Sequence, residues 1–196
     1  MHPMAQRYFN WTLAIVLVVG VIVLAAAALS LHKWQRSTLA EESLPLGEQA
    51  FAEQNWEEAA KQIGRYLTIN GDDTARLLKY GQAQEKIRPS TSSGVQHAIA
   101  AYSAVLRLDG GNAEAAKRLI AIYLGESPGE AELKARQFLE GNDDPTIRQY
   151  LSVALIQRRD FPEAQRTLAS LIHDHPSHVP AYEVMGLLAA EQPAEV

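Results

Sequence analysis

Residues 145–178 read PTIRQYLSVALIQRRDFPEAQRTLASLIHDHPSH, and this stretch decides the fold. Asp160 and Glu163 form a capping box, in which the first side chain accepts from the start of a helix and the acid three residues later reaches back. Pro176 stands twelve residues after Ala164 and can end a helix because it has no backbone N–H. The stretch therefore predicts a helix, a turn, a second helix and a stop.

The same phrase recurs along the chain. Its alanine returns as Ala59, Ala98, Ala131 and Ala164, at spacings of 39, 33 and 33 residues. A helix stopper follows three of these alanines after twelve residues, as Gly71, Gly110 or Pro176. A pair made of an apolar and a small residue also recurs, as Leu46-Gly47, Tyr80-Gly81, Leu151-Ser152 and Met185-Gly186. The repeating unit is a pair of helices.

A capping signal opens each second helix of these pairs. The expected caps are Asn55 with Glu58, Ser93 with Gln96, Ser127 with Glu130, and Asp160 with Glu163. The adjacent carboxylates at 57–58, 72–73 and 143–144 are accordingly interpreted as caps and turn residues, not as catalytic acid and base.

With this spacing the chain resembles the tetratricopeptide repeat (TPR) family, whose unit of about 34 residues reads W-x-x-L-G-x-x-Y, then A-x-x-x-F, then P. Most of the family's tryptophans are missing here, and the third unit has Ile120 in the glycine position. The resemblance divides residues 40–196 as follows: repeats at 40–73, at 74–112 with a lengthened turn at 88–93, at 113–142 in degenerate form and at 145–178, then the first helix of an incomplete repeat at 179–196.

An apolar segment precedes the repeats. From Trp11 to Leu31 there is no charged residue, and about 1.5 Å of rise per residue lets such a helix cross a hydrocarbon core of roughly 30 Å. We expect a tail at 1–10, a transmembrane anchor at 11–32 and a linker at 33–39. The fold class expected is all-α, with an N-terminal transmembrane helix followed by an α-solenoid of TPR-like repeats.

The alternative for this segment is a cleaved signal peptide, because Ala25 to Ala28 offer small residues for cleavage. Basic residues flank the segment almost evenly, with Arg7 before it and Lys33 and Arg36 after it. The expectation is a single-pass protein of a bacterial inner membrane with its repeats on the extracytoplasmic side.

Composition excludes several classes of function. The 196 residues include no cysteine, which removes disulfides, thiolate zinc sites and Cys nucleophiles. Eighteen Lys and Arg face 23 Asp and Glu, for a formal net charge of −5, which argues against nucleic acid as a partner. No phosphate-binding loop, hydrolase elbow or zinc-protease motif occurs, so we expect neither catalysis nor a cofactor. His173, His175 and His178 are interpreted as loop residues, with a metal site as the alternative.

The resemblance implies protein binding in the concave groove that the first helices of TPR units line. It places in that groove Glu48, Phe51, Gln82, Glu85, Lys117, Ala121, Leu124, Gln149, Val153 and Ile156. The groove would be acidic near the membrane and apolar further along, and would suit a partner helix or extended peptide. Alternatively, Phe51, Leu124, Val153 and Ile156 pack partly against neighbouring helices.

These features predict a membrane-anchored scaffold that recruits another protein through its groove, with residues 11–32 in the lipid bilayer. Two alternatives remain open. The repeats could be the accessory region of a larger enzyme or transport assembly that continues beyond Val196, or a secreted soluble binding module released by signal cleavage.

Overall fold

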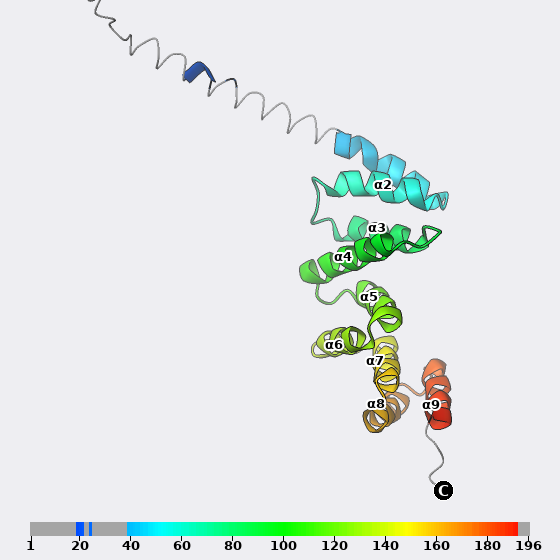
Figure 1. The fold of residues 1–196 in the computed structure, drawn as a ribbon. Coiled ribbons are helices and arrows are strands. Elements are labelled where there is room, and N and C mark those ends of the chain that lie inside the picture. The colour runs from blue at the N-terminus through cyan, green and yellow to red at the C-terminus, as the bar shows by residue number, and fades with distance from the viewer. Residues whose placement is uncertain (1–18, 22–23, 25–38, 192–196) are drawn as a thin grey trace, which may run out of the picture.

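The computed structural model describes residues 19–21, 24 and 39–191. Figure 1 shows its helices stacked one after another along an elongated array. A helix over residues 39–52 comes first. It is followed by α2 (Trp56–Leu67), α3 (Thr74–Lys86), α4 (Ser92–Leu108), α5 (Ala113–Glu126), α6 (Pro128–Leu139), α7 (Pro145–Gln157), α8 (Phe161–Asp174) and α9 (Val179–Glu191). The described residues form no strand.

The helices pair as hairpins. We call the helix over 39–52, α3, α5, α7 and α9 the first helices, and α2, α4, α6 and α8 the second helices. From α2 onward each helix packs against the next one along the chain, and α7 also contacts α5 and α9. This is the layout of an α-solenoid, in which each hairpin covers the apolar face of its neighbour.

Small residues allow the helices to approach closely. The recurring alanines Ala59, Ala98, Ala131 and Ala164 are completely buried, each near the start of a second helix. Three hydrophobic clusters follow one another along the array, the first around Ala59 and Ala83, the second around Tyr102 and the third running from α5 to α9. The core is therefore a continuous seam between hairpins rather than one central mass.

The caps agree with the sequence in part. Asn55 and Asp160 each accept a hydrogen bond from the backbone N–H three residues on, and Asp73 and Asp144 likewise cap α3 and α7. In the capping box of Asn55 and Glu58, the return hydrogen bond from the Asn55 N–H to the Glu58 carboxylate is not formed, because that carboxylate binds Lys61 and Gln62.

Two expected capping hydrogen bonds are not formed. The side chain of Ser127 makes no capping hydrogen bond. At the start of α4 the cap is Thr91 instead of Ser93, with the Thr91 hydroxyl accepting from the Gly94 N–H at 3.1 Å. Thr91 has the same kind of hydroxyl acceptor as Ser93 but stands two residues earlier, directly before the first residue of α4.

The turns of the first and fourth hairpins share a backbone device. Gln54 and Arg159, each one residue before a cap, have positive φ values of 60° and 65°. The N–H groups of Asn55 and Asp160 then donate to carbonyls five residues back, at Ala50 and Leu155. Both turns thus close in the same way, although neither has a glycine.

The expected anchor at 11–32 lies almost wholly outside the described residues. Residues 19–21 and 24 are helical, and Val19, Val21 and Leu24 expose their side chains. Among the described residues, no helix combines the length and the apolar character needed to cross a membrane.

Candidate functional site

The ten residues expected in the groove fall on four consecutive first helices. Glu48 and Phe51 lie on the helix over 39–52, and Gln82 and Glu85 on α3; Lys117, Ala121 and Leu124 lie on α5, and Gln149, Val153 and Ile156 on α7. Ala121 is exposed and the other nine are half-buried. All ten are therefore placed on elements that the solenoid aligns, with part of each side chain within reach of solvent.

A chain of polar contacts links these first helices. Glu48 is paired with Lys79 and lies 3.3 Å from Nε of Arg76, both on α3. Glu85 on α3 accepts from Arg118 on α5 at 3.0 Å. We call the polar contacts that join consecutive first helices the polar ladder.

The polar ladder continues to the end of the array. Lys117 on α5 lies 2.8 Å from Asp144, the cap of α7. Gln149 on α7 is hydrogen-bonded at 2.8 Å to Nε2 of His178, the residue before α9. Each contact joins one first helix to the next, so four of the expected groove residues fix neighbouring hairpins against each other.

The charge expected of the groove is different in the structure. Glu48 and Glu85 were to make its first half acidic, but both carboxylates are neutralised by cations on the next first helix. The sequence does not reveal those cations as partners because they lie 31 and 33 residues further on. The one signal that could have found them is this separation itself, which is close to the repeat length.

The apolar members combine packing with exposure. Leu124, Val153 and Ile156 pack against the cluster that runs from α5 to α9 and remain half-buried. Phe51 meets Trp56 edge-on with ring centroids 5.3 Å apart, and Nζ of Lys79 lies 5.5 Å from the Phe51 centroid. The packing alternative for these four residues thus describes part of each side chain. We call the three that lie half-buried on α5 and α7 the apolar stripe: Leu124, Val153 and Ile156.

Tyr102 adds a further hydrogen bond to the polar ladder. It is completely buried, and its hydroxyl donates to the Glu85 carboxylate that also binds Arg118. Burial, and then the hydrogen bond to Glu85, raise the pKa of Tyr102 far above its ordinary value, so the phenol stays protonated. The group acts as a hydrogen-bond donor to Glu85.

A second set of ion pairs ties α6, α7 and α8. Glu132 binds both Arg136 and Arg158, and Arg136 also reaches Glu163 at 2.7 Å. Partial burial acts to raise the pKa of Glu132, but the hydrogen bonds from the two arginines outweigh it and hold that pKa below its ordinary value. The carboxylate is thus ionised and occupied, as structural ion pairs are.

The three histidines do not converge. His173 contacts Asp174 at 3.1 Å, His175 lies 3.4 Å from Asp143, and His178 binds Gln149. In the part of the chain that the structure describes, no three His, Cys, Asp or Glu residues are arranged to hold a metal ion.

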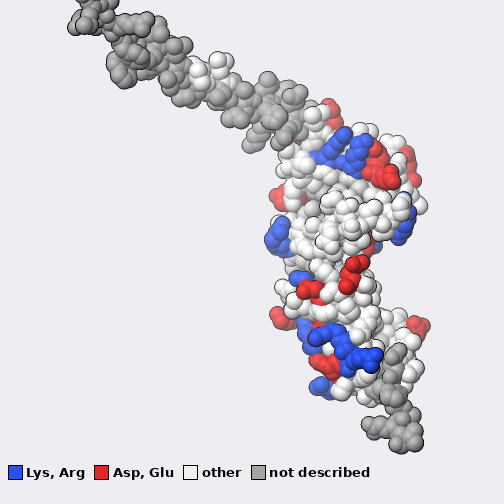
Figure 2. All heavy atoms as spheres, viewed as in Figure 1, with Lys and Arg blue, Asp and Glu red and all other residues white. Residues whose placement is uncertain are grey.

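Charged groups of both signs lie side by side on the surface that Figure 2 shows.

The comparisons with known proteins support the architecture. No family model and no curated protein matches the sequence. Among solved structures, a MamA protein is similar with a TM-score of 0.65 at 17% identity, over 76% of this chain and 80% of that one. MamA from Desulfovibrio magneticus has a TM-score of 0.63 at 15% identity, over 77% of this chain and 84% of its own. Another MamA crystal structure has a TM-score of 0.63 at 18% identity, over 73% of this chain and 82% of its own.

The chain has a TPR-like α-solenoid fold. The expected helical class is confirmed at that level, and at identities below one fifth the likeness extends to the fold alone. What the surface of this solenoid binds has to be argued from its own residues.

Proposed function

We propose that this protein is a scaffold that binds another protein along its first helices and performs no chemistry. The observation that carries the proposal is the apolar stripe of Leu124, Val153 and Ile156, partly exposed beside the polar ladder. Because the ladder fixes the spacing of the first helices, the stripe is presented at little cost in conformational entropy on binding. A partner helix would lay its apolar face there.

The proposal includes an anchor at 11–32 that holds the scaffold at a membrane, with the repeats outside the cytoplasm. Its support is the sequence, which has no charged residue from Trp11 to Leu31. The intact mass of the native protein in the membrane fraction tests it. A mass near 21.6 kDa is expected for a retained anchor, whereas a mass lower by about 25 residues means a cleaved signal peptide and contradicts the anchor.

Photo-crosslinking in cells of the source organism tests the binding surface. A photoreactive amino acid replaces Ala121, which is exposed between Lys117 and Leu124 on α5. We expect a discrete crosslinked protein, and we expect it to disappear when Leu124→Glu and Ile156→Glu are introduced together. The same photoreactive residue at Arg166, exposed on α8, is the control for contacts elsewhere on the solenoid.

A milder variant guards against misfolding, since Leu124 and Ile156 also touch the core. Ala121→Arg adds bulk and charge to the stripe without removing a core contact, and it should block capture of the crosslinked protein while the helical circular dichroism stays unchanged. Undiminished capture by folded Ala121→Arg and by the double variant would contradict the proposed surface.

A further inference from the structure

Three pockets lie at equivalent positions of consecutive hairpins. Each lies between two consecutive second helices, above the first helix that separates them in the chain. The pocket between α2 and α4 has a volume of about 300 Å³, that between α4 and α6 about 440 Å³, and that between α6 and α8 about 340 Å³. They are equivalent positions of the repeat, so their differences reflect the side chains that line them.

The α4–α6 pocket differs from the other two in charge. Arg107 on α4 and Lys134 on α6 line it, no Asp or Glu does, and neither cation forms an ion pair with any residue that the structure describes. The α2–α4 pocket has no Lys or Arg in its lining. Two uncompensated cations in one pocket of a chain with a net charge of −5 favour a negatively charged ligand.

In the α6–α8 pocket, one of the two cations is neutralised and a carboxylate lines the pocket. Arg148 there is bound to Asp143 at 3.0 Å and to Asp174 at 2.7 Å. Arg166 shares the pocket with Glu163 and donates to the carbonyl of Pro162. Among these three pockets, the α4–α6 pocket is thus the one lined by two cations without an ion pair and by no carboxylate.

The same pocket has an apolar floor. Leu119 and Ile120 on α5 close it from below, and Phe138 forms part of one wall. Leu106 on α4 adds a further apolar side chain to the lining. The pocket therefore offers an apolar surface next to its two cations.

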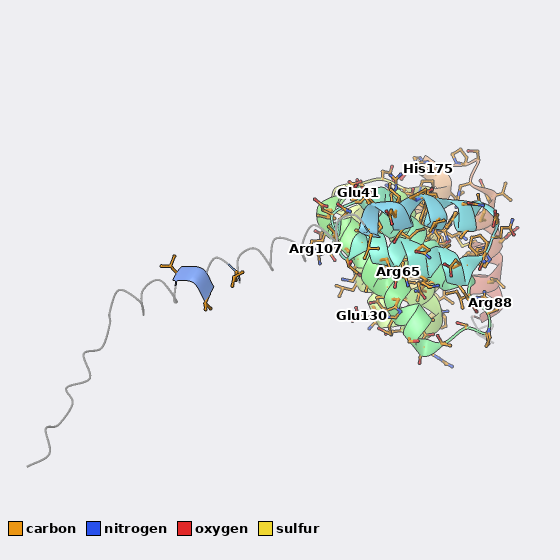
Figure 3. All side chains as sticks on the ribbon, turned by 90° about the horizontal axis from the view of Figure 1, so that it is seen from above. Glu41, Arg65, Arg88, Arg107, Glu130 and His175 are labelled. Atoms are coloured by element: carbon orange, nitrogen blue, oxygen red, sulfur yellow. The ribbon has the colours of Figure 1, made fainter. Side chains whose placement is uncertain are left out.

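We propose that the α4–α6 pocket binds an acidic, amphipathic segment of a partner protein. One apolar side chain of the segment would enter between α4 and α6, and its Asp or Glu side chains would pair with Arg107 and Lys134. The apolar side chains of Leu106, Leu119 and Phe138 beside the two cations favour a segment that carries both apolar and acidic side chains over an inorganic anion. Figure 3 shows Arg107 projecting from the edge of the array, accessible from outside.

This surface is distinct from the apolar stripe of the proposed function. Its walls come from second helices, whereas the stripe lies on the first helices α5 and α7. One scaffold could therefore hold two proteins at once, one on each side of α5.

Fluorescence anisotropy with the purified full-length chain tests the pocket. The probe is a labelled peptide in which leucine and phenylalanine alternate with aspartate and glutamate, and a second peptide with lysine at the acidic positions controls for apolar contact alone. We expect the acidic peptide to bind, the basic one not to bind, and affinity to fall as salt is added. Equal binding of both peptides would overturn the proposal.

Variants then locate the binding. Arg107→Glu with Lys134→Glu should weaken the acidic peptide at least about tenfold. Ser103→Trp, which fills the pocket from an exposed position on α4, should do the same with both cations in place. Arg166→Glu, the matched change in the α6–α8 pocket, should leave the affinity unchanged.

Three results would overturn the assignment. The first is unchanged affinity in the charge-reversal and Ser103→Trp variants, and the second is loss of affinity on Ala121→Arg, which would place the peptide on the stripe. The third is equally tight binding of octanoate with the same dependence on Arg107 and Lys134, which would make the site one for small amphiphilic anions. Failure of the crosslinking at Ala121 leaves all these readouts intact.

Discussion

Gly81 on α3 lies directly against the ring of Tyr102 on α4: a Cβ built on Gly81 would lie 2.5 Å from Cε1 of that ring. Tyr102 is completely buried and its hydroxyl is held by Glu85, so the ring has no free space into which it could move. Gly47 has the same relation to Ile63, whose Cγ1 would lie 2.8 Å from an added Cβ. The recurring glycine of the repeat therefore serves close helix contact, and no backbone strain is involved.

Gly81→Ala should lower the free energy of unfolding by about 1 to 3 kcal/mol, because the added methyl overpacks a rigid contact. The matched control is Gly186→Ala in α9, at the same place in the repeat, where nothing lies within 4 Å of the added Cβ. That change should stabilise by up to about 1 kcal/mol, since alanine is the better helix former. Urea unfolding followed by circular dichroism measures both, and a neutral Gly81→Ala would contradict the close contact.

Tyr102 and Glu85 should be energetically coupled through their hydrogen bond. Glu85→Ala leaves a buried hydroxyl without its acceptor and should cost about 1 to 3 kcal/mol, whereas Tyr102→Phe should cost about 1 kcal/mol. In the Tyr102→Phe background Glu85→Ala should cost less than it does alone. A double-mutant cycle in urea measures this coupling, and strictly additive losses would show that the two groups do not interact.

Glycine should be preferred at the two left-handed turn positions. Gln54 and Arg159 have φ values of 60° and 65°, where a side chain costs about 1 to 2 kcal/mol relative to the right-handed region. Gln54→Gly and Arg159→Gly should therefore each stabilise by up to about 1 kcal/mol, part of the gain being offset by glycine's greater freedom in the unfolded chain. Gln96→Gly, exposed within α4, should instead destabilise by about 1 kcal/mol. Thermal unfolding of the three variants separates the effects, and a destabilised Arg159→Gly would contradict the strained turn.

Stability should depend on pH through Asp174. Its hydrogen bonds, first with His173 and then with Arg148, lower the pKa of Asp174 from 3.8 to about 2. Because the pKa is lower in the folded chain, the unfolded chain binds the proton first as pH falls. The contribution of Asp174 is therefore complete above about pH 4 and is lost as pH falls toward 2.

Asp174→Asn tests this dependence. The wild-type chain should be more stable than the variant at neutral pH, and the difference between their urea midpoints should shrink between about pH 4 and pH 2. A difference that stays constant over this interval would show that the carboxylate is not responsible.

The sequence supported the fold because its signals are local. Asn55 and Asp160 cap their helices as expected, and the four recurring alanines are all completely buried. Prediction was weaker where several side chains compete for one role, as at the start of α4, where Thr91 caps in place of Ser93. Ser127 opens α6 without a side-chain hydrogen bond, which the pattern of residues does not reveal.

The site could be predicted less well because its character depends on partners distant in the chain. The sequence placed Glu48 and Glu85 on first helices but could not show that Lys79 and Arg118 neutralise them. Likewise, Arg107 and Lys134 are unremarkable as sequence, and only the packing of α4 and α6 over α5 gives them a common pocket.

By itself, then, the sequence determined the helical repeat, because caps, stoppers and small residues act through the backbone within a few residues or at one fixed period. The tertiary structure decided which charges are paired and which remain available. Two side chains about 30 residues apart meet only when one hairpin stacks on the next, and the energy of a charge pair depends on the distance at which the two charges meet.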